Sequence, residues 1–383
     1  MNRLNQLTEI HQSGKPYIIY KSKKGFNLYT NFSKKIILNN ENIKSFLTKK
    51  NKKKSKDTDL FIGFFGYELL NNLIDVKIPK QKNLNFPKGI FYKPEKKIKL
   101  SNKLNYDFEN FKSGNFKINI NRKNYTKIFN KFKKKIKSGE TYQIKICTKY
   151  KTKSKINPLD FFSRLSDTNL APEAFMIKDN NYSIISCSPE TLIIKKGSNI
   201  STKPIAGTVK KTKQLNKIKA LNYFRKNLKE TKEHNMIVDM ERNDLSRICK
   251  VGSVKLSKQK IVEEYKDLFH YVSLIKGKLK KNINNFEIIK AMMPGGSVIG
   301  CPKINTLNLL NNQEKENRNI YTGSFGYIKF NGDMRFNIII RSILNFKNIS
   351  EISVASGVVV DSNANHEFNE NFLKAKALID LFK

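Results

Sequence analysis

The sequence predicts an α+β fold, because helix-like and strand-like segments follow each other in irregular order rather than in a βαβ alternation. Apolar residues at helical spacing mark Tyr125 to Lys137, and Gly139 follows as expected at a helix C-terminus. Thr141 to Thr148 alternates polar and apolar residues as a strand does. Phe175 to Ile177 and Tyr182 to Cys187 flank a polar turn and predict a hairpin.

The N-terminal part contains short strands separated by charged segments. Tyr17 to Tyr29 holds two β-like runs around a turn, and Lys49 to Asp57 is a basic run typical of a solvated loop. Leu60 to Glu68 is apolar with two glycines, which predicts a buried strand closely approached by another backbone. A polar stretch at Asn105 to Asn115 predicts a boundary between residues 1–118 and residues 119–383.

The remaining elements are expected in the second region. Apolar periodicity predicts helices at Lys229 to Ile248, Ile288 to Met293, Ile304 to Leu310 and Asn365 to Phe382. Strand patterns occur at Thr191 to Ile194, Gly323 to Phe330, Phe336 to Leu344 and Ile352 to Val360.

The formal net charge is +42, from 74 Lys and Arg against 32 Asp and Glu, and a charge of this size suits nucleic acid or an anionic membrane. The lysines are spread over almost every segment, which favours a compositional drift over a binding footprint. We therefore expect no nucleic-acid and no membrane partner.

The four cysteines are widely spaced and form no C-x-x-C pair, so reduced thiols are expected rather than a disulfide framework. No apolar signal segment and no apolar run of membrane-spanning length occurs. These features predict a cytoplasmic protein.

The stretch from Met292 to Lys303 predicts a loop that could bind an anion. Pro294 should end the preceding helix, and the pair Gly295-Gly296 allows positive φ angles and a close approach to the backbone. Ser297 adds a hydroxyl group. The alternative is an ordinary connection between two helices.

The last helix places Glu367, Glu370 and Lys374 on one face, at spacing i, i+3, i+7. This pattern is either functional or a row of surface salt bridges. A different stripe is expected to face the core and consists of Phe368, Phe372, Ala375 and Ile379.

Two further acids are candidates for chemistry. Glu233 begins a helix above apolar residues, and if it met Glu370 in space, the two carboxylates would suit Mg²⁺. Glu190 follows Pro189 at the end of an apolar strand, where burial would raise its pKa toward a value useful for proton donation. Either acid could equally be structural.

Several motifs in this order resemble the chorismate-utilising enzymes, which include component I of aminodeoxychorismate synthase and of anthranilate synthase. The resemblance is dense over Asn121 to Lys383 and looser at Gly63 to Glu68. The motifs are Thr202 to Thr208, Met236 to Asp239, Arg242 to Leu245, Gly252 to Val254, His270 to Ser273 and Pro294 to Lys303.

The resemblance implies two large, mainly antiparallel β-sheets packed as a sandwich with helices outside, and chorismate as the substrate. It implies that Glu233 and Glu370 hold Mg²⁺, that Glu190 is the general acid, and that His270 lies near the leaving group. The implied chorismate contacts are Gly207, Thr208, Tyr327, Arg341, Gly357 and Lys374.

Single positions indicate the reaction within the family. Gln143 stands where the water-using members carry a lysine, which favours ammonia as nucleophile. The Pro-Gly-Gly-Ser sequence of the loop and the segment Gly323 to Tyr327 resemble aminodeoxychorismate synthase component I. We therefore expect the chain to have this activity. Its ammonia would come from a separate glutamine amidotransferase subunit in a heterodimer. Ala206 points to anthranilate synthase component I as the alternative, because some aminodeoxychorismate synthases have lysine there.

Two smaller departures from the family pattern remain. Ala355 stands where glycine is usual, and Arg335 stands where many members have aspartate.

Overall fold

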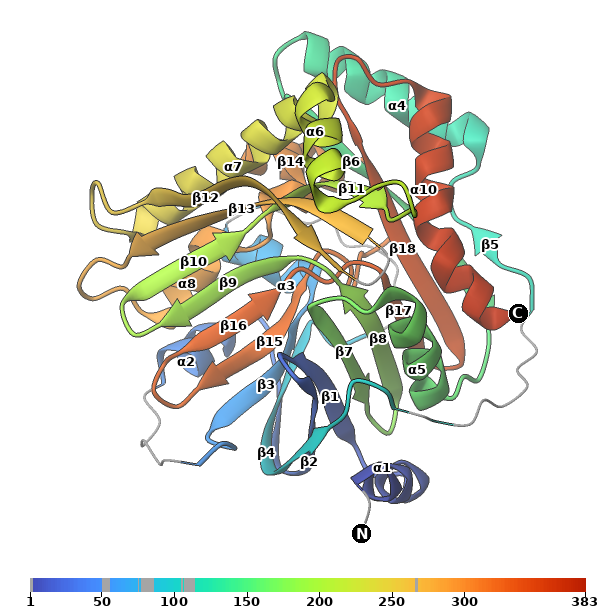
Figure 1. Cartoon of the computed structure of the whole chain (residues 1–383), viewed down its shortest axis with the longest axis vertical. Coiled ribbons are helices and arrows are strands. Elements are labelled where there is room, and N and C mark those ends of the chain that lie inside the picture. Colours follow the sequence, from blue (N-terminus) through green and yellow to red (C-terminus); the bar gives the residue numbers. More distant parts are fainter. Residues whose placement is uncertain are drawn as a thin grey trace.

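The structure is a computed structural model that describes residues 3–49, 56–74, 76, 86–104, 106, 114–265 and 268–383. Its described residues form helices and antiparallel strands in irregular order, so the predicted α+β class is confirmed (Figure 1). Most of the expected basic loop, at 50–55, and most of the expected boundary, at 107–113, lie outside the described residues.

The strands connect through antiparallel pairs into one network. Along it, neighbours follow the order β5, β6, β18, β17, β8, β7, β1, β2, β4, β3, β15, β16, β9, β10, β13 and β12, while β14 pairs with β6 and β11 with β13. Their bounds are β1 (Tyr17–Ser22), β2 (Gly25–Ile37), β3 (Leu60–Phe65), β4 (Gly89–Leu100), β5 (Lys117–Ile118), β6 (Gln143–Lys153), β7 (Glu173–Lys178), β8 (Tyr182–Ser188), β9 (Thr191–Lys196), β10 (Asn199–Lys203), β11 (Ile205–Lys210), β12 (Lys255–Glu264), β13 (Leu268–Lys278), β14 (Gly300–Cys301), β15 (Ser324–Lys329), β16 (Met334–Asn337), β17 (Ser342–Phe346) and β18 (Ile349–Val358).

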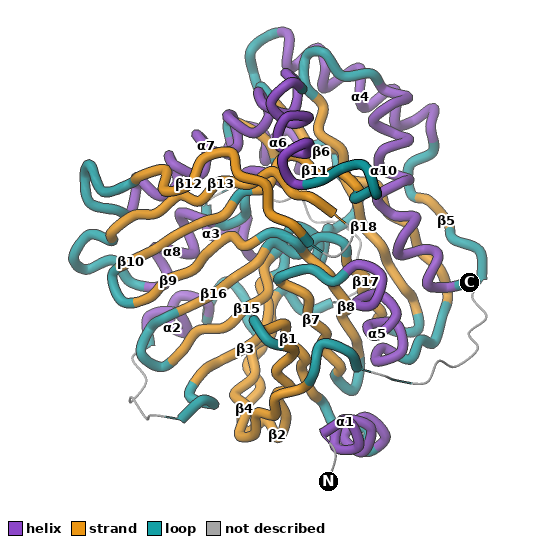
Figure 2. Tube along the Cα trace, in the orientation of Figure 1, coloured by secondary structure: helices purple, strands orange, loops and turns teal. Residues whose placement is uncertain are grey.

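The network folds so that its two halves face each other. One buried cluster combines Ile177 and Ile184, from β7 and β8, with Phe64 and Phe325, from β3 and β15. The rings of Phe175 and Phe325 stack with their centroids 3.7 Å apart. The expected sandwich is therefore present, with β1 and β2 joining its halves (Figure 2). Because β1 pairs with β7 and β3 with β15, sheet pairing crosses the expected boundary, and the division at 118 stays a prediction.

Helices cover the outer faces of the sandwich. Helix α4 packs beside α10 over β6 and β18, α5 lies over β7 and β8, and α7 packs on α8 and β13 (Figure 1). No helix of the described ranges is long and apolar enough to cross a membrane. The helices are α1 (Arg3–Gln12), α2 (Ile43–Thr48), α3 (Tyr67–Leu73), α4 (Arg122–Lys137), α5 (Pro158–Asn169), α6 (Lys217–Lys226), α7 (Leu228–Ile248), α8 (Asn285–Met292), α9 (Lys303–Asn311) and α10 (Ala364–Ile379).

The predicted continuous strand from Phe336 to Leu344 is wrong. Strand β16 ends at Asn337 and β17 begins at Ser342, and Arg341 between them has a φ of 50°. Strand β16 pairs with β9 whereas β17 pairs with β8, so the chain passes here from one half of the sandwich to the other. Arg341 thus lies at a bend rather than within a ladder.

The expected core stripe of α10 is correct except at Phe372. Ala375 is buried, and Phe368 and Ile379 are partly buried and pack against core clusters, whereas Phe372 is 46% exposed. The helix also buries Glu367, Asn371 and Leu378. The buried polar side chains have partners: Ser362 Oγ donates to Glu367 Oε1 at 3.0 Å, and Asn371 Nδ2 donates to the Ile146 carbonyl at 3.5 Å. Hydrogen bonds to the neighbouring strand and loop therefore let this helix bury two polar residues beside its apolar stripe.

Two glycine predictions have different outcomes. A Cβ on Gly63 would collide with the backbone of Ile90 on β4, which confirms the expected close approach. The pair Gly295-Gly296 does not use positive φ. Instead, a Cβ on Gly295 would lie 2.6 Å from Ile338 Cδ1, and one on Gly296 would collide with Met240, so these glycines make room for neighbouring side chains.

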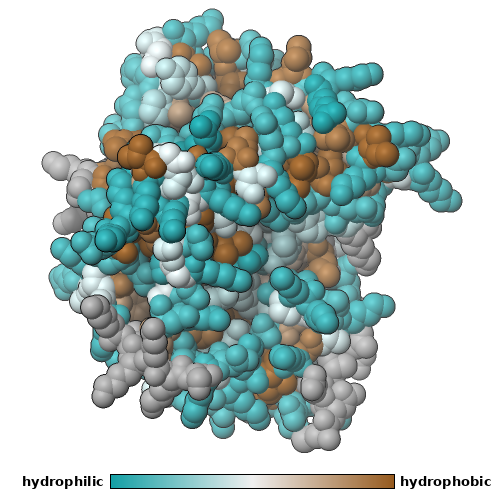
Figure 3. Space-filling model, turned by 60° about the vertical axis from the view of Figure 1, so that its left-hand side comes forward, coloured by the Kyte–Doolittle hydropathy of each residue, from teal (hydrophilic) through white to brown (hydrophobic). Residues whose placement is uncertain are grey.

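The surface agrees with the lysine-rich composition. Figure 3 shows one face on which hydrophilic side chains predominate and hydrophobic ones gather in small groups. Scattered exposed apolar residues of this kind are normal for a folded protein.

Substituting Gly63→Ala should lower the free energy of unfolding by about 1–3 kcal/mol, because the strand pair β3 and β4 must separate to admit a methyl group. Urea denaturation measures the loss. Gly114→Ala is the matched control, since its added Cβ would have no neighbour closer than 3.5 Å. Equal stability of the two variants would contradict the close approach.

Candidate active site

The site begins on β6, where Gln143 and Lys145 lie two residues apart and so share a face of the strand. Both donate to the same oxygen of Glu233 on α7: Gln143 Nε2 lies 3.0 Å and Lys145 Nζ 3.1 Å from Glu233 Oε1. Gly357 pairs with Lys145 across β18, and a Cβ there would lie 2.7 Å from Lys145 Nζ. The absence of a side chain at Gly357 therefore gives the ammonium group its place.

The Glu233–Lys145 pair stays charged at neutral pH. Lys145 is the largest cause that lowers the pKa of Glu233. Burial acts to lower the pKa of Lys145, but Glu233, followed by Glu370 and Glu190, outweighs it and raises that pKa. Lys145 is therefore a cation and a poor proton acceptor here, although the sequence analysis did not single it out.

A second carboxylate and a second lysine lie on α10. Lys374 Nζ is 2.6 Å from Glu370 Oε1 and also donates to the Ala355 carbonyl at 3.0 Å. Burial acts to raise the pKa of Glu370, but Lys374 and then Lys145 lower it below its ordinary value. The predicted pairing of Glu370 with Lys374 on one face is thus observed, and Glu233 is among the charges that act on Glu370.

These carboxylates fit the requirements of a magnesium ion. Mg²⁺ is bound through one or two carboxylates while water and substrate oxygens complete its shell. Glu233 and Glu370 offer two ionised groups from two helices. Glu370 also lies with Glu367 and His366, whose ligand atoms and its own all fall within 4.8 Å of one another. Glu367 is an acid that helical spacing had grouped with Glu370 and that the structure buries.

Glu190 lies where β8 ends and β9 begins, and it is 5% exposed. Burial raises its pKa to about 7, against the opposing effects of Ser297 and Lys145. Ser297 Oγ, from the loop between α8 and α9, lies 2.9 Å from Glu190 Oε1. A carboxyl group with this pKa is half protonated near neutral pH and can donate a proton, as predicted for this position.

The loop from Met292 to Lys303 therefore acts on the site mainly through Ser297. Its lysine is not free to bind an anion, because Lys303 Nζ lies 2.5 Å from Asp244 Oδ2 in a buried ion pair. Backbone hydrogen bonds from Tyr142 and Lys145 to the carbonyls of Cys301 and Ile299 fix the loop along β6.

Thr208 and His270 form a second part of the site on the pair β11 and β13. They are register partners, and Thr208 Oγ1 lies 2.8 Å from His270 Nδ1. Burial, followed by the charge of Arg341, lowers the pKa of His270 to about 4, so its imidazole is neutral. Gly207 precedes Thr208 and lies against Phe224, which leaves no space for a Cβ.

Arg341 provides an uncompensated positive charge. Its guanidinium makes no hydrogen bond or ion pair with any residue in the described ranges, and burial lowers its pKa. A half-buried cation without a partner is costly unless an anion binds to it. Planar guanidinium groups bind carboxylates with two parallel hydrogen bonds, so the geometry suits a carboxylate ligand.

The structure places Tyr327 in a different group. On β15 its ring lies 6.3 Å from that of Tyr20, and Tyr20 donates to the buried carboxylate of Glu173. Arg335 Nη2 lies 2.5 Å from Glu173 Oε1, so this departure from the family pattern belongs to a buried ion pair. The hydroxyl of Tyr321 meets the backbone of Ala355, and the charge of Arg318 acts on it.

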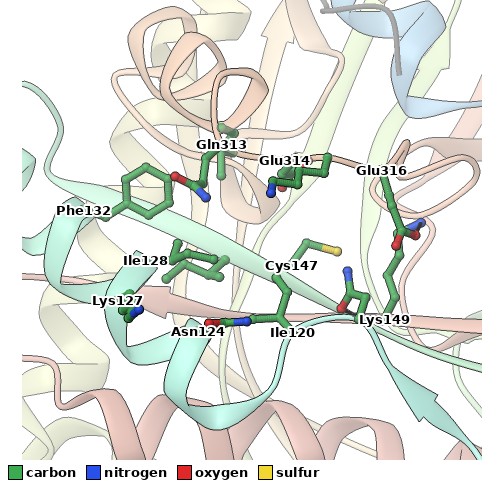
Figure 4. A pocket seen from close by; sticks show the side chains of 14 residues that line it. Ile120, Asn124, Lys127, Ile128, Phe132, Cys147, Lys149, Gln313, Glu314 and Glu316 are labelled. Atoms are coloured by element: carbon green, nitrogen blue, oxygen red, sulfur yellow. Dashed lines mark hydrogen bonds and ion pairs between the residues drawn. The ribbon is translucent and has the colours of Figure 1, made fainter. Parts of the chain in front are cut away.

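A separate cavity of about 380 Å³ lies between α4, β6 and the segment from Leu310 to Glu316 (Figure 4). It contains none of the expected site residues. Cys147 lines it, and burial raises the pKa of this thiol to about 12, so it is not a reactive thiolate.

Comparison with known proteins identifies relatives. Residues 11–380 match the family model described as chorismate binding enzyme. Aminodeoxychorismate synthase component 1 of Bacillus subtilis (strain 168) is 34% identical over 267 residues, and the match covers 70% of this chain and 57% of that protein. An anthranilate synthase component I-like protein of Synechocystis sp. (strain ATCC 27184 / PCC 6803 / Kazusa) is 31% identical over 347 residues, which cover 83% of this chain and 72% of that protein.

The fold has relatives among solved structures. The crystal structure of anthranilate synthase component I from Streptococcus pneumoniae TIGR4 superposes with a TM-score of 0.79 at 24% identity. The superposition covers 95% of this chain and 92% of that one, and at this identity it bears on the fold alone.

Substituting Glu190→Gln should change how stability depends on pH. Because the pKa of Glu190 is raised, the folded chain holds more protons than the unfolded chain between pH 4.5 and 7, and stability falls as pH rises through this window. The substitution removes this contribution of roughly 3 kcal/mol, so thermal melts should show Glu190→Gln gaining stability relative to the unchanged chain from pH 4.5 to pH 7. Glu68, whose pKa is also about 7, titrates in both proteins and cancels in the difference. A difference independent of pH would contradict the raised pKa.

Proposed function

The chain belongs to the chorismate binding enzyme family, as its motifs indicated, and we propose that it is component I of aminodeoxychorismate synthase. It would aminate chorismate with ammonia to give 4-amino-4-deoxychorismate. The name of the Bacillus subtilis relative supports this reaction, and so does the Pro-Gly-Gly-Ser sequence of the loop at Pro294 to Ser297.

The observation that carries the proposal is the buried carboxyl group of Glu190 with its pKa of about 7. In the proposed reaction this group protonates the ring hydroxyl of chorismate, which leaves as water when its C–O bond breaks. Ammonia adds to the ring with its lone pair, and the resulting ammonium then loses a proton. Ser297 holds the carboxyl group in place, and the neutral His270 lies near the leaving group with Thr208 beside it.

Binding of the dianionic substrate rests on fixed positive charges. Arg341 offers an unpaired guanidinium for one carboxylate, and Lys374 adds an ammonium. Glu233 and Glu370 would hold Mg²⁺, which when bound neutralises a substrate carboxylate as a Lewis acid. Gly357 has no side chain, which leaves room beside them for Lys145 and Gln143.

Ammonia is the proposed nucleophile because neither of the described β6 side chains that contact Glu233 can act as a base toward water. Gln143 is an amide, and Lys145 stays protonated beside Glu233. Ala206, in the bulge where the register of β11 shifts between Ile205 and Gly207, presents only a methyl group. A covalent adduct through an amine at that position is therefore excluded.

Anthranilate synthase component I is the second candidate. Ala206 favours it, and so does the name of the Synechocystis relative. This reaction would use the same bound substrate but add ammonia at C2 and then eliminate pyruvate.

A separate glutamine amidotransferase subunit would supply the ammonia. The relative from Bacillus subtilis is named as a component, which supports a partner chain. The thiols of this chain do not suit glutamine hydrolysis, because burial raises the pKa of each of the four. The pKa of Cys187 rises to about 12 and that of Cys249 to about 11, and the values of Cys147 and Cys301 are raised as well.

Incubation of the purified chain with chorismate, Mg²⁺ and an ammonium salt tests the function. We expect chorismate to be consumed, and the product to yield 4-aminobenzoate only after a separate lyase is added. Fluorescent anthranilate together with pyruvate would establish the second candidate instead. If chorismate were not consumed, both would fail.

Substituting Arg341→Ala should raise the KM for chorismate by about 10- to 100-fold, because a charge-assisted contact to a carboxylate is lost. Steady-state kinetics measures this, and circular dichroism checks the fold. Arg242→Gln is the matched control, since Arg242 is half-exposed and pairs only weakly with Asp239 at 3.2 Å. An unchanged KM in Arg341→Ala would remove Arg341 from the binding site.

A further inference from the structure

Lys145 occupies the place beside Glu233 that a metal ion would need. We propose that its ammonium is a built-in competitor of the divalent cation, which keeps metal binding weak until the anionic substrate arrives. This inference rests on the proposed function, because it concerns the same carboxylates and the same dianion.

The ammonium is held there by its surroundings. Lys145 is 13% exposed, and its Nζ lies 3.1 Å from Glu233 Oε1. The strand that carries it is fixed on both sides, because its backbone N–H donates to Ile299 O at 3.0 Å and its carbonyl accepts from Arg318 Nη2 at 3.2 Å. Because Gly357 has no side chain, there is room for the ammonium group opposite it, where a Cβ would lie 2.7 Å from Lys145 Nζ.

Two partners therefore share one oxygen of Glu233, and they differ in charge. Gln143 is neutral and Lys145 is positive, at nearly equal distances from Glu233 Oε1. A divalent cation at this oxygen would gain from the carboxylate but be repelled by the ammonium a few ångströms away. Only Lys145 would repel the metal ion in this way, because Gln143 carries no charge.

The charges of the group show why the substrate would relieve the repulsion. Two carboxylates, Glu233 and Glu370, are matched by two ammonium groups, Lys145 and Lys374, so the charges of these four side chains cancel without a metal. A divalent cation adds two positive charges to these four side chains, and a bound dianion offsets them. Metal and substrate should consequently strengthen each other's binding, and the coupling must be reciprocal.

A purely structural salt bridge would predict something else. Its loss would lower stability and activity without making metal binding tighter. The competing role predicts a gain of metal affinity when the charge is removed, which a structural role does not produce.

Mn²⁺, monitored by its electron paramagnetic resonance signal, is the probe for metal binding, and titrations are made with and without chorismate. In the absence of chorismate, Lys145→Met should bind Mn²⁺ about tenfold more tightly than the unchanged chain. Gln143→Met, which removes the neutral partner of the same oxygen, should not tighten binding. Lys135→Met, which removes a lysine from the exposed pair with Glu140, should behave as the unchanged chain does.

One further measurement and two further variants complete the test. Chorismate should tighten Mn²⁺ binding less in Lys145→Met than in the unchanged chain. Lys145→Gln replaces Lys145→Met if thermal melts show that the methionine variant does not fold. Glu233→Gln should abolish the tight component, which locates the ion.

Equal Mn²⁺ affinity in Lys145→Met and the unchanged chain would overturn the inference, as would an equal gain in Gln143→Met. Tight binding that persists in Glu233→Gln would also overturn it. Failure of the proposed function has a different signature: chorismate is not consumed and does not affect Mn²⁺ affinity, whereas the Lys145→Met gain without chorismate remains.

Discussion

The candidate site depends on the long antiparallel pairing of β6 with β18, which runs from Lys153 opposite Ile349 to Ile144 opposite Val358. This register puts Lys145 opposite Gly357, so one strand supplies a long cation where the other supplies no side chain. Because β18 leads directly into α10, the same pairing also brings Glu370 and Lys374 toward β6. A shift by one residue would turn Gln143 and Lys145 to the opposite face and separate them from Glu233.

The sequence predicted the elements with strong local patterns. The hairpin of β7 and β8 and the helices α4 and α7 follow from periodicity and turn residues alone, and the structure has them within a few residues. The motifs located Thr208 and His270, which are in contact, and Glu190, whose carboxyl group accepts a hydrogen bond from the backbone of β11, the strand that carries Thr208. The sequence could not predict which of these side chains contact each other, because spacing along the chain does not determine tertiary contacts.

The failures have identifiable physical causes. The apolar pattern around Ile338 to Ile340 could not reveal the bend at Arg341, because that bend follows from the chain changing its partner strand from β9 to β8. Periodicity assigned Phe372 to the core, whereas hydrogen bonds to Ser362 and to the backbone of β6 bury Glu367 and Asn371 instead. Lys145 was hidden among many lysines, and only its contact with Glu233 distinguishes it.

The β6–β18 pairing also has a consequence for folding during synthesis, because the ribosome makes the two strands at different times. Residues 143–153 leave the exit tunnel about two hundred residues before their partner, which lies at 349–358. During that interval β6 has an unsatisfied edge on the side of β18, and unpaired edges invite contact with other chains. Vectorial synthesis therefore completes this strand pair long after β6 is made, and the lysine-rich composition of the nascent chain, through mutual repulsion, offers one means of keeping that edge from premature association.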